Sequence, residues 1–357
     1  MTLFASFADT LFSLARPLVH ASDAETAHSL TITALERLPR ARCAVTSPML
    51  ETTVAGIPFP NPVGLAPGFD KDGRVPAIMP HFGFGFVEVG TLTPLPQAGN
   101  PRPRLFRLTQ DRAVINRLGF NNGGQSAAVP RLARARRSGL AVPLGINIGA
   151  NKDAADRILD YVNGLAAMAD LADYITVNIS SPNTPGLRAL QDKGALEELL
   201  DGVLGLRSAP DYAVPVFLKV APDLTAADID DITDIALRRG LDALIVSNTT
   251  ITRPPLADAQ ASETGGLSGA PLRDLAQQRL VDFRKASGGA IPLIGVGGIA
   301  SADDAWARIR AGASLVQLYS ALVFEGPGLA GRIARGLEAL ARRDGFARVA
   351  DAVGVDG

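Results

Sequence analysis

The stretch YITVNISSPNTPG, residues 174–186, joins an apolar run to a chemically dense turn. The run, residues 174–177, is rich in β-branched and aromatic residues, which is typical of a buried strand. Two amides and three hydroxyls follow, and two prolines and a glycine exclude a helix there. Polar side chains at the carboxyl end of a parallel strand are what an α/β binding site needs, although an ordinary capped turn uses the same residue types.

Seven other short apolar runs resemble this strand, and amphipathic stretches at 153–170, 195–207, 226–239, 271–286 and 302–311 separate most of them. Eight buried strands alternating with helices predict an α/β fold, the (β/α)8 TIM barrel. The alternative is an open doubly wound sheet, but the residues after the first run lack its phosphate fingerprint. The runs are Val63–Ala66, Phe86–Val89, Leu144–Ile148, Tyr174–Ile179, Val216–Val220, Ala243–Val246, Pro292–Val296 and Ser314–Leu318.

Two segments outside this alternation have expected roles in the barrel. Residues 52–59 read as a hairpin that closes the barrel floor. The connection at 91–141 is too long for a plain loop, and long loops in compact domains are usually functional. We expect it to form part of the wall of the site.

The first forty residues predict a small N-terminal helical extension, which we bound at residues 1–42 before a barrel domain at 43–357. A second helix is expected after Ser22 and Asp23, an N-cap candidate. A pair of helices packed on the core is the commoner case; the alternative is a surface that docks on a membrane or admits an apolar ligand. The apolar positions at steps of three and four on the first helix are Phe4, Phe7, Leu11, Leu14 and Leu18.

Composition excludes several classes of protein. The net charge of −1 lacks the excess of positive charge that is typical of nucleic-acid-binding proteins. A single cysteine, Cys43, excludes an internal disulfide, an iron–sulfur cluster and a cysteine-based zinc site, and the three histidines lack metal-ligand spacing. No apolar run is long enough for a transmembrane helix, and Asp9 interrupts the apolar N-terminus, so neither a membrane span nor a secretory signal is expected.

In a barrel, the carboxyl ends of all strands open into one pocket. Here the ends are rich in amides and lysine and poor in carboxylates, which is unsuited to a metal or glycosidase site and suits a planar anionic substrate. Gly295–Gly298 after the seventh strand and Ser320 after the eighth occupy positions where barrels bind phosphate. Lys219, inside an apolar strand, can stabilise charge on a cofactor ring or pair with a structural carboxylate.

The chain resembles the dihydroorotate dehydrogenase family, specifically its class 2, quinone-linked members. The likeness runs through essentially the whole chain in order, and several of its motifs are long. They are Ala66–Lys71, Asn116–Asn122, Asn147–Gly149, Asn178–Gly186, Lys219–Asp223, Ser247–Thr250, Gly265–Gly269, Gly295–Gly298 and Leu318–Ser320. Ser247 stands where many members have threonine, and Pro67 where many have alanine.

The resemblance implies an FMN-binding barrel that oxidises (S)-dihydroorotate to orotate in pyrimidine biosynthesis and passes the electrons to a membrane quinone. Ser181 matches the catalytic base, where class 1 members have cysteine, and a water or hydroxyl relay through Thr184 is expected to remove the proton. The substrate would be held by Lys71, Asn116, Arg117, Leu118, Gly119, Phe120, Asn178, Asn183, Asn248 and Thr249. The FMN contacts would be Pro67, Gly68, Phe69, Asp70, Lys71, Thr91, Asn147, Asn178, Lys219, Ser247, Gly269, Gly298, Tyr319 and Ser320.

The resemblance also gives the N-terminal helices a role, as the mouth of a quinone tunnel and a surface in peripheral contact with membrane lipid. His28 and Arg107 match polar residues of that tunnel. It implies a monomer on the cytoplasmic side of the inner membrane. Two rival functions stay open: another FMN barrel oxidoreductase with a different substrate, and a barrel that binds a phosphorylated ligand without chemistry.

Overall fold

The computed structural model describes residues 3–41 and 45–357, with side chains from residue 8 onward. Phe4 and Phe7 of the expected apolar stripe, Cys43 and the expected domain boundary therefore lie outside the described side chains.

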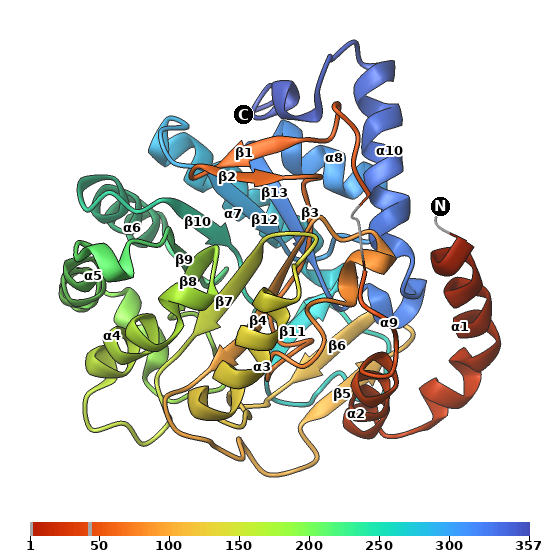
Figure 1. The fold of residues 1–357 in the computed structure, drawn as a ribbon, viewed down its shortest axis with the longest axis horizontal. Helices are drawn as coiled ribbons and strands as arrows, with labels where there is room; N and C mark the ends of the chain where they lie inside the picture. Colours follow the sequence, from red (N-terminus) through yellow and green to blue (C-terminus); the bar gives the residue numbers. More distant parts are fainter. Residues whose placement is uncertain (1–2, 42–44) are drawn as a thin grey trace.

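The eight apolar runs form a closed barrel of eight parallel strands, as predicted (Figure 1). The last strand pairs with the first, with Leu318 opposite Leu65, so the alternative of an open sheet is wrong. The strands are β3 (Val63–Leu65), β4 (Phe86–Leu92), β7 (Leu144–Ile148), β8 (Tyr174–Asn178), β9 (Val216–Val220), β10 (Ala243–Val246), β12 (Leu293–Val296) and β13 (Ala313–Leu318).

Helices surround the barrel (Figure 1). In α5, Leu196, Leu199, Leu200 and Val203 are buried at helical spacing, as expected for an amphipathic helix against a sheet. The outer helices are α3 (Gln125–Arg137), α4 (Arg157–Met168), α5 (Lys193–Arg207), α6 (Ala226–Arg238), α7 (Arg273–Ser287), α8 (Ala302–Arg310), α9 (Leu322–Glu325) and α10 (Leu329–Arg343). Short 3-10 helices are η1 (Met79–Phe82), η2 (Ala169–Leu171), η3 (Leu187–Gln191), η4 (Pro210–Tyr212), η5 (Ala270–Leu272) and η6 (Val349–Ala352).

The floor of the barrel is filled with apolar side chains. The strands β1 (Thr52–Val54) and β2 (Ile57–Phe59) pair as the predicted antiparallel hairpin. Phe59 from this hairpin meets Phe86 edge-on at 5.2 Å between ring centroids, and Tyr174 stacks on Phe217 at 4.4 Å. This packing closes the amino end, so a ligand has only the carboxyl end of the strands in which to bind.

The long insert contributes two strands to a small antiparallel sheet that was not predicted from the sequence, and the connection after β10 contributes the third. The sheet consists of β5 (Leu105–Leu108), β6 (Ala113–Asn116) and β11 (Gly266–Gly269), in the order β11-β6-β5. Asn116, the last residue of β6, is paired with Leu105 on one side and Gly266 on the other. The sheet therefore fixes the backbone of a predicted substrate residue from both sides.

The two N-terminal helices are α1 (Leu3–Ala21) and α2 (Ala24–Leu35), and Asp23 caps α2 by accepting a hydrogen bond from the Thr26 N–H at 2.8 Å. In Figure 1, α1 stands at the edge of the molecule beside α9. Asp9 of α1 binds the backbone N–H of Gly328 and the guanidinium of Arg332. Of the helices in the described ranges, none has the length and apolar character needed to cross a membrane.

Candidate active site

A cavity of about 730 Å³ runs from the carboxyl ends of the strands to the inner faces of α1 and α2. Cavities of this size bind small molecules and cofactors in other proteins. The structure brings most of the predicted site residues to its walls. They are His28, Pro67, Gly68, Phe69, Lys71, Thr91, Arg107, Asn116, Leu118, Gly119, Phe120, Asn178, Ser181, Asn183, Lys219, Ser247, Asn248, Thr249, Gly269, Gly298, Tyr319 and Ser320.

Three predicted contacts lie elsewhere. Asp70 is buried and accepts hydrogen bonds from the backbone N–H groups of Arg74 and Val75, so it organises the turn after β3. Arg117 points away from the cavity, where it pairs with Glu263 at 2.7 Å. Asn147 lies one layer behind the wall.

Asn147 connects the cavity wall to the barrel interior. Its Oδ1 accepts hydrogen bonds from Thr91 Oγ1 at 2.6 Å and Asn178 Nδ2 at 3.1 Å. Its Nδ2 donates to Oε1 of the fully buried Glu88 at 2.8 Å. These bonds fix the orientation of the Asn178 amide, which donates through Nδ2 to Thr91 and Asn147 and accepts through Oδ1 from Ser180.

Glu88, Tyr174 and Gln317 complete this interior network, and the sequence analysis missed all three. Glu88 Oε2 accepts from Gln317 Nε2 at 2.6 Å and from the Tyr174 hydroxyl at 3.1 Å. Glu88 and Gln317 are polar residues inside otherwise apolar strands, which is the same signal that singled out Lys219. Inward and outward positions alternate along barrel strands, so that signal was available in the sequence.

Lys219 is a buried lysine whose amino group has no partner in the described ranges. The side chain is buried and lines the cavity, yet in the described ranges its ammonium takes part in neither a hydrogen bond nor an ion pair. Burial lowers the pKa of Lys219, and the field of Glu88 opposes that change. The alternative of direct pairing with a structural carboxylate is therefore not what the structure contains, and the ammonium is free to face a ligand.

The turn after β8, the strand next to β9, carries Ser181. Its Oγ is buried and accepts a hydrogen bond from the Asn183 N–H at 3.2 Å. Asn183 Nδ2 in turn donates to Asn116 Oδ1 at 3.2 Å, so the turn is tied to the small sheet. The hydroxyl of Thr184 is buried without a hydrogen-bond partner among the described residues.

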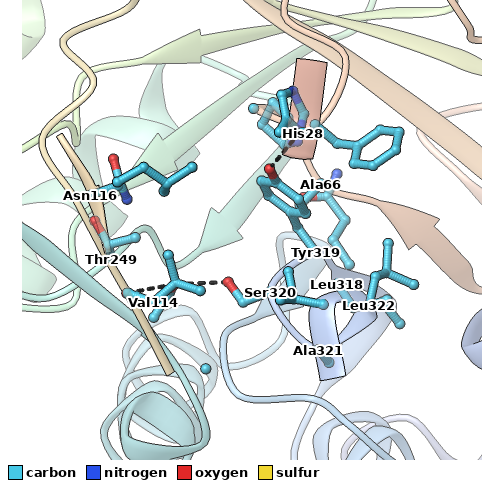
Figure 2. A pocket seen from close by; sticks show the side chains of 18 of the residues that line it. His28, Ala66, Val114, Asn116, Thr249, Leu318, Tyr319, Ser320, Ala321 and Leu322 are labelled. Carbon is cyan, nitrogen blue, oxygen red and sulfur yellow. Dashed lines mark hydrogen bonds between the residues drawn. The ribbon is translucent and has the colours of Figure 1, made fainter. Parts of the chain in front are cut away.

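His28 and Tyr319 face each other where the barrel end joins the helical end of the cavity (Figure 2). Lys71 contacts His28 there. His28 Nε2 lies 3.2 Å from Lys71 Nζ, and its Nδ1 lies 3.4 Å from the Tyr319 hydroxyl. Burial and the charge of Lys71 lower the pKa of His28 to about 3, so the ring is neutral at physiological pH. Burial lowers the pKa of Lys71 to about 8. A neutral His28 accepts from the Lys71 ammonium through Nε2, which assigns the ring proton to Nδ1.

Beyond the carboxyl ends of β12 and β13, the cavity is lined by backbone groups and small hydroxyls. Gly298 has a left-handed φ of +72°, and a Cβ there would lie 2.5 Å from Arg273 Cα. Ser320 Oγ lies 2.7 Å from Ser268 Oγ, a partner of the site that the sequence analysis missed. In the part of the chain that the structure describes, the N–H groups of Gly298 and Ile299 have no acceptor, which leaves them open to an anion.

The helical end of the cavity, beside α1, is apolar. Ala8, Phe12, Ala15 and Val19 of α1 line it, while Leu11 lies where this wall meets the exposed side. Arg107 reaches this end and donates to the carbonyl of His20 at 2.9 Å. Among the described residues there is no group of acidic, histidine or cysteine side chains that could hold a metal ion.

Comparison with known proteins identifies the family. The profile of the family described as dihydroorotate dehydrogenase matches residues 49–340. The chain is 74% identical over 354 residues to a protein of Sphingopyxis alaskensis named dihydroorotate dehydrogenase (quinone), covering 99% of both chains. It is 62% identical to the protein of the same name from Novosphingobium aromaticivorans, covering 97% of this chain and 99% of that one.

Solved structures agree with the sequence comparison. The crystal structure of DHODH from Eimeria tenella in complex with ferulenol superposes with a TM-score of 0.88 at 40% identity, covering 93% of this chain and 95% of that chain. The ligand-free form gives a TM-score of 0.89, with 94% and 99% of the two chains covered. The chain therefore belongs to the dihydroorotate dehydrogenase family, and within it to the class 2, quinone-linked members.

Proposed function

We propose that this protein oxidises (S)-dihydroorotate to orotate in pyrimidine biosynthesis, with FMN as the hydride acceptor and a membrane quinone as the final electron acceptor. The observation that carries the proposal is the continuity of one cavity. Ser181, the amides and the unpaired Lys219 line its polar end, and α1 and α2 line its apolar end. The names of the relatives give the substrate and the class of acceptor.

The donors and acceptors of the cavity fit FMN. When bound, FMN supplies a ring that accepts two electrons and a proton from the substrate as a hydride. Lys219 would hold the negative charge of the reduced ring, and Gln317, whose buried Oε1 lacks a partner in the described ranges, would accept from a ring N–H. The open N–H groups of Gly298 and Ile299 would hold the phosphate.

The substrate is an anion with amide-like ring edges, and Lys71 and the asparagines match it. With a pKa of about 8, Lys71 is mostly cationic at neutral pH and would hold the substrate carboxylate. Asn116, Asn183 and Asn248 offer donors and acceptors to the ring edge. Asn178 would line the same site with its amide already bonded to Thr91, Asn147 and Ser180. Because these amides are fixed by one another and by the backbone, much of the rate acceleration would come from positioning.

Ser181 would act as the base that takes a proton from the carbon next to the ring carbonyl, while the neighbouring carbon loses the hydride. A serine hydroxyl is a weak base and needs a proton acceptor behind it. The buried, unpartnered hydroxyl of Thr184, three residues along the same turn, supports its place in a hydroxyl or water relay.

The N-terminal helices, together forming a domain at residues 1–42 ahead of the barrel at 43–357, would admit the quinone. Leu11, Leu14 and Leu18 are 57%, 74% and 78% exposed, so α1 presents apolar side chains outward as well as into the cavity. Such a surface supports peripheral docking on lipid, here at the cytoplasmic side of the inner membrane. Arg107 and His28 would be the polar contacts of the quinone head group within this tunnel.

The test is anaerobic mixing of the purified protein with dihydroorotate while the flavin absorbance is followed. The expected result is bleaching, with recovery on addition of a quinone and none with NAD. A yellow protein that does not bleach would favour another FMN oxidoreductase, and a colourless protein after gentle purification would favour a binding barrel without chemistry.

A further inference from the structure

Arg308 of α8 is a buried cation without an acidic partner in the described part of the chain. Its residue is 1% exposed, and it forms no ion pair there. Its guanidinium donates only to neutral acceptors: Gln277 Oε1 at 2.8 Å, the Arg273 carbonyl at 2.7 Å and the Gly297 carbonyl at 2.8 Å. Buried charges in proteins are normally paired with an opposite charge, because desolvation is costly.

The nearest carboxylate does not neutralise this charge by contact. Asp304, one turn earlier on α8, binds the Arg273 side chain at 3.1 Å and the Ala300 N–H at 3.0 Å. Burial lowers the pKa of Arg308 to about 10, and the field of Asp304 opposes the change. The guanidinium is therefore still protonated at physiological pH.

The position of Arg308 relates this charge to the cavity. Gly297 and Gly298 line the cavity end that carries the open N–H groups. Since a trans peptide holds its carbonyl and its N–H on opposite sides, the bond from Arg308 to the Gly297 carbonyl directs the Gly298 N–H away from the guanidinium. Arg273 Nε donates to the Gly298 carbonyl at 3.2 Å and orients the next N–H in the same way.

We propose that Arg308 is a positioning residue whose buried charge, acting through the Gly297 peptide, makes this end of the cavity select a phosphorylated flavin over an unphosphorylated one. The proposal rests on the proposed function in taking FMN as the ligand. The phosphate dianion is the missing opposite charge, and the peptide between the two groups is polarised by both. A purely structural arginine would support both flavins equally.

The experiment measures the dissociation constants of FMN and of riboflavin for the full-length protein by the quenching of flavin fluorescence. Two variants are compared with the parent: R308K, which keeps the charge, and R308Q, which keeps a hydrogen-bond donor and loses the charge. In R308Q we expect FMN to bind roughly tenfold or more weakly, as for loss of a buried charge partner, and riboflavin to change less than about threefold. R308K should stay closer to the parent in its preference for FMN.

Equal losses for both flavins in R308Q, or an unchanged preference for FMN, would overturn the proposal. If R308Q cannot be purified, the parent loaded with riboflavin provides the test, because its phosphate end is then vacant. Inorganic phosphate, compared with chloride at equal ionic strength, should bind there and slow riboflavin release; no effect of phosphate would count against the proposal. A protein that binds neither flavin would instead remove the proposed function itself.

Discussion

The two ends of the cavity differ in how they are built. At the barrel end, the side chains are polar, buried and fixed by a network that reaches from Thr91 through Asn147 to Glu88. At the helical end, the lining is mostly apolar, and α1 is attached to the barrel region by a few contacts, such as those of Asp9. A polar anion and an apolar molecule thus each find a matching end of one cavity, and the flavin would lie between them.

This contrast indicates a division of labour between the two half-reactions. Removal of a proton and a hydride from one substrate requires groups fixed to fractions of an ångström, and strand ends of a closed barrel provide such rigidity. Admission of a lipid-soluble acceptor requires an apolar surface that can contact a membrane, and a helix pair provides it with little geometric precision. A substitution at one end of the cavity should therefore impair one half-reaction and leave the other intact.

The largest effect is expected from Ser181→Ala. Loss of the base should slow reduction of the flavin by dihydroorotate roughly 10²–10⁴-fold, while flavin and substrate still bind. Stopped-flow absorbance measures this rate. Ser208→Ala is the control, since that hydroxyl binds the Leu204 carbonyl at the end of α5, outside the cavity. Unchanged reduction by the Ser181 variant would remove the assignment of the base.

Replacement of Lys219 by methionine should have the next largest effect. Without the buried ammonium the reduced flavin loses its countercharge, so flavin reduction should slow about 10²-fold, as for loss of one preorganised electrostatic group. The reduction potential of the bound flavin should fall as well. Lys193→Met, at an exposed lysine of α5, is the control. Full activity with a normal potential would show that Lys219 has no such role.

A single substitution, Leu18→Ser, tests the helical end alone. The side chain is 78% exposed, and burial of a leucine in an apolar phase contributes about 1.5–3 kcal/mol, so binding to lipid vesicles should weaken roughly 10–100-fold. Sedimentation with vesicles measures it. Leu237→Ser removes an exposed leucine from α6 and should have no effect. Equal losses of vesicle binding in the α1 variant and in Leu237→Ser would mean that α1 has no special affinity for lipid.

The smallest effect concerns pH. Because the substrate carboxylate needs a cationic Lys71, kcat/KM for dihydroorotate should fall as pH rises through about 8, by about tenfold at pH 9. Stability does not explain such a fall. A lysine with a lowered pKa binds fewer protons folded than unfolded, so its contribution to the free energy of unfolding increases between pH 8 and 10.5. Lys71→Gln should remove the inflection, and an inflection that persisted would assign it to another group.

Sequence patterns predicted the barrel well because each of its strands is a continuous apolar run between amphipathic helices. The small sheet was missed because β5 and β6 are four residues each, and their alternation of buried and half-buried residues is too short to stand out. The sequence pattern also could not predict that the leucines of α1 are exposed. Apolar spacing places Leu11, Leu14 and Leu18 on one face of α1, but only the tertiary structure reveals that this face is turned outward.

The site was predicted mainly through the strand ends and the resemblance. Motif residues at those ends line the cavity, whereas Arg117 belongs to the same motif as Asn116 and points to Glu263 instead. A motif gives the backbone path and leaves the direction of each side chain to its neighbours. The contact between His28 and Lys71 joins residues from two different parts of the chain, and no local pattern in the sequence encodes it.

The most direct test of this division of labour measures both half-reactions in the protein that lacks residues 1–40. We expect anaerobic bleaching by dihydroorotate at close to the parent rate, together with slow reoxidation by a hydrophobic quinone. A shortened protein that loses flavin reduction and quinone reoxidation together, or one that keeps full quinone turnover, would contradict the assignment of the two ends.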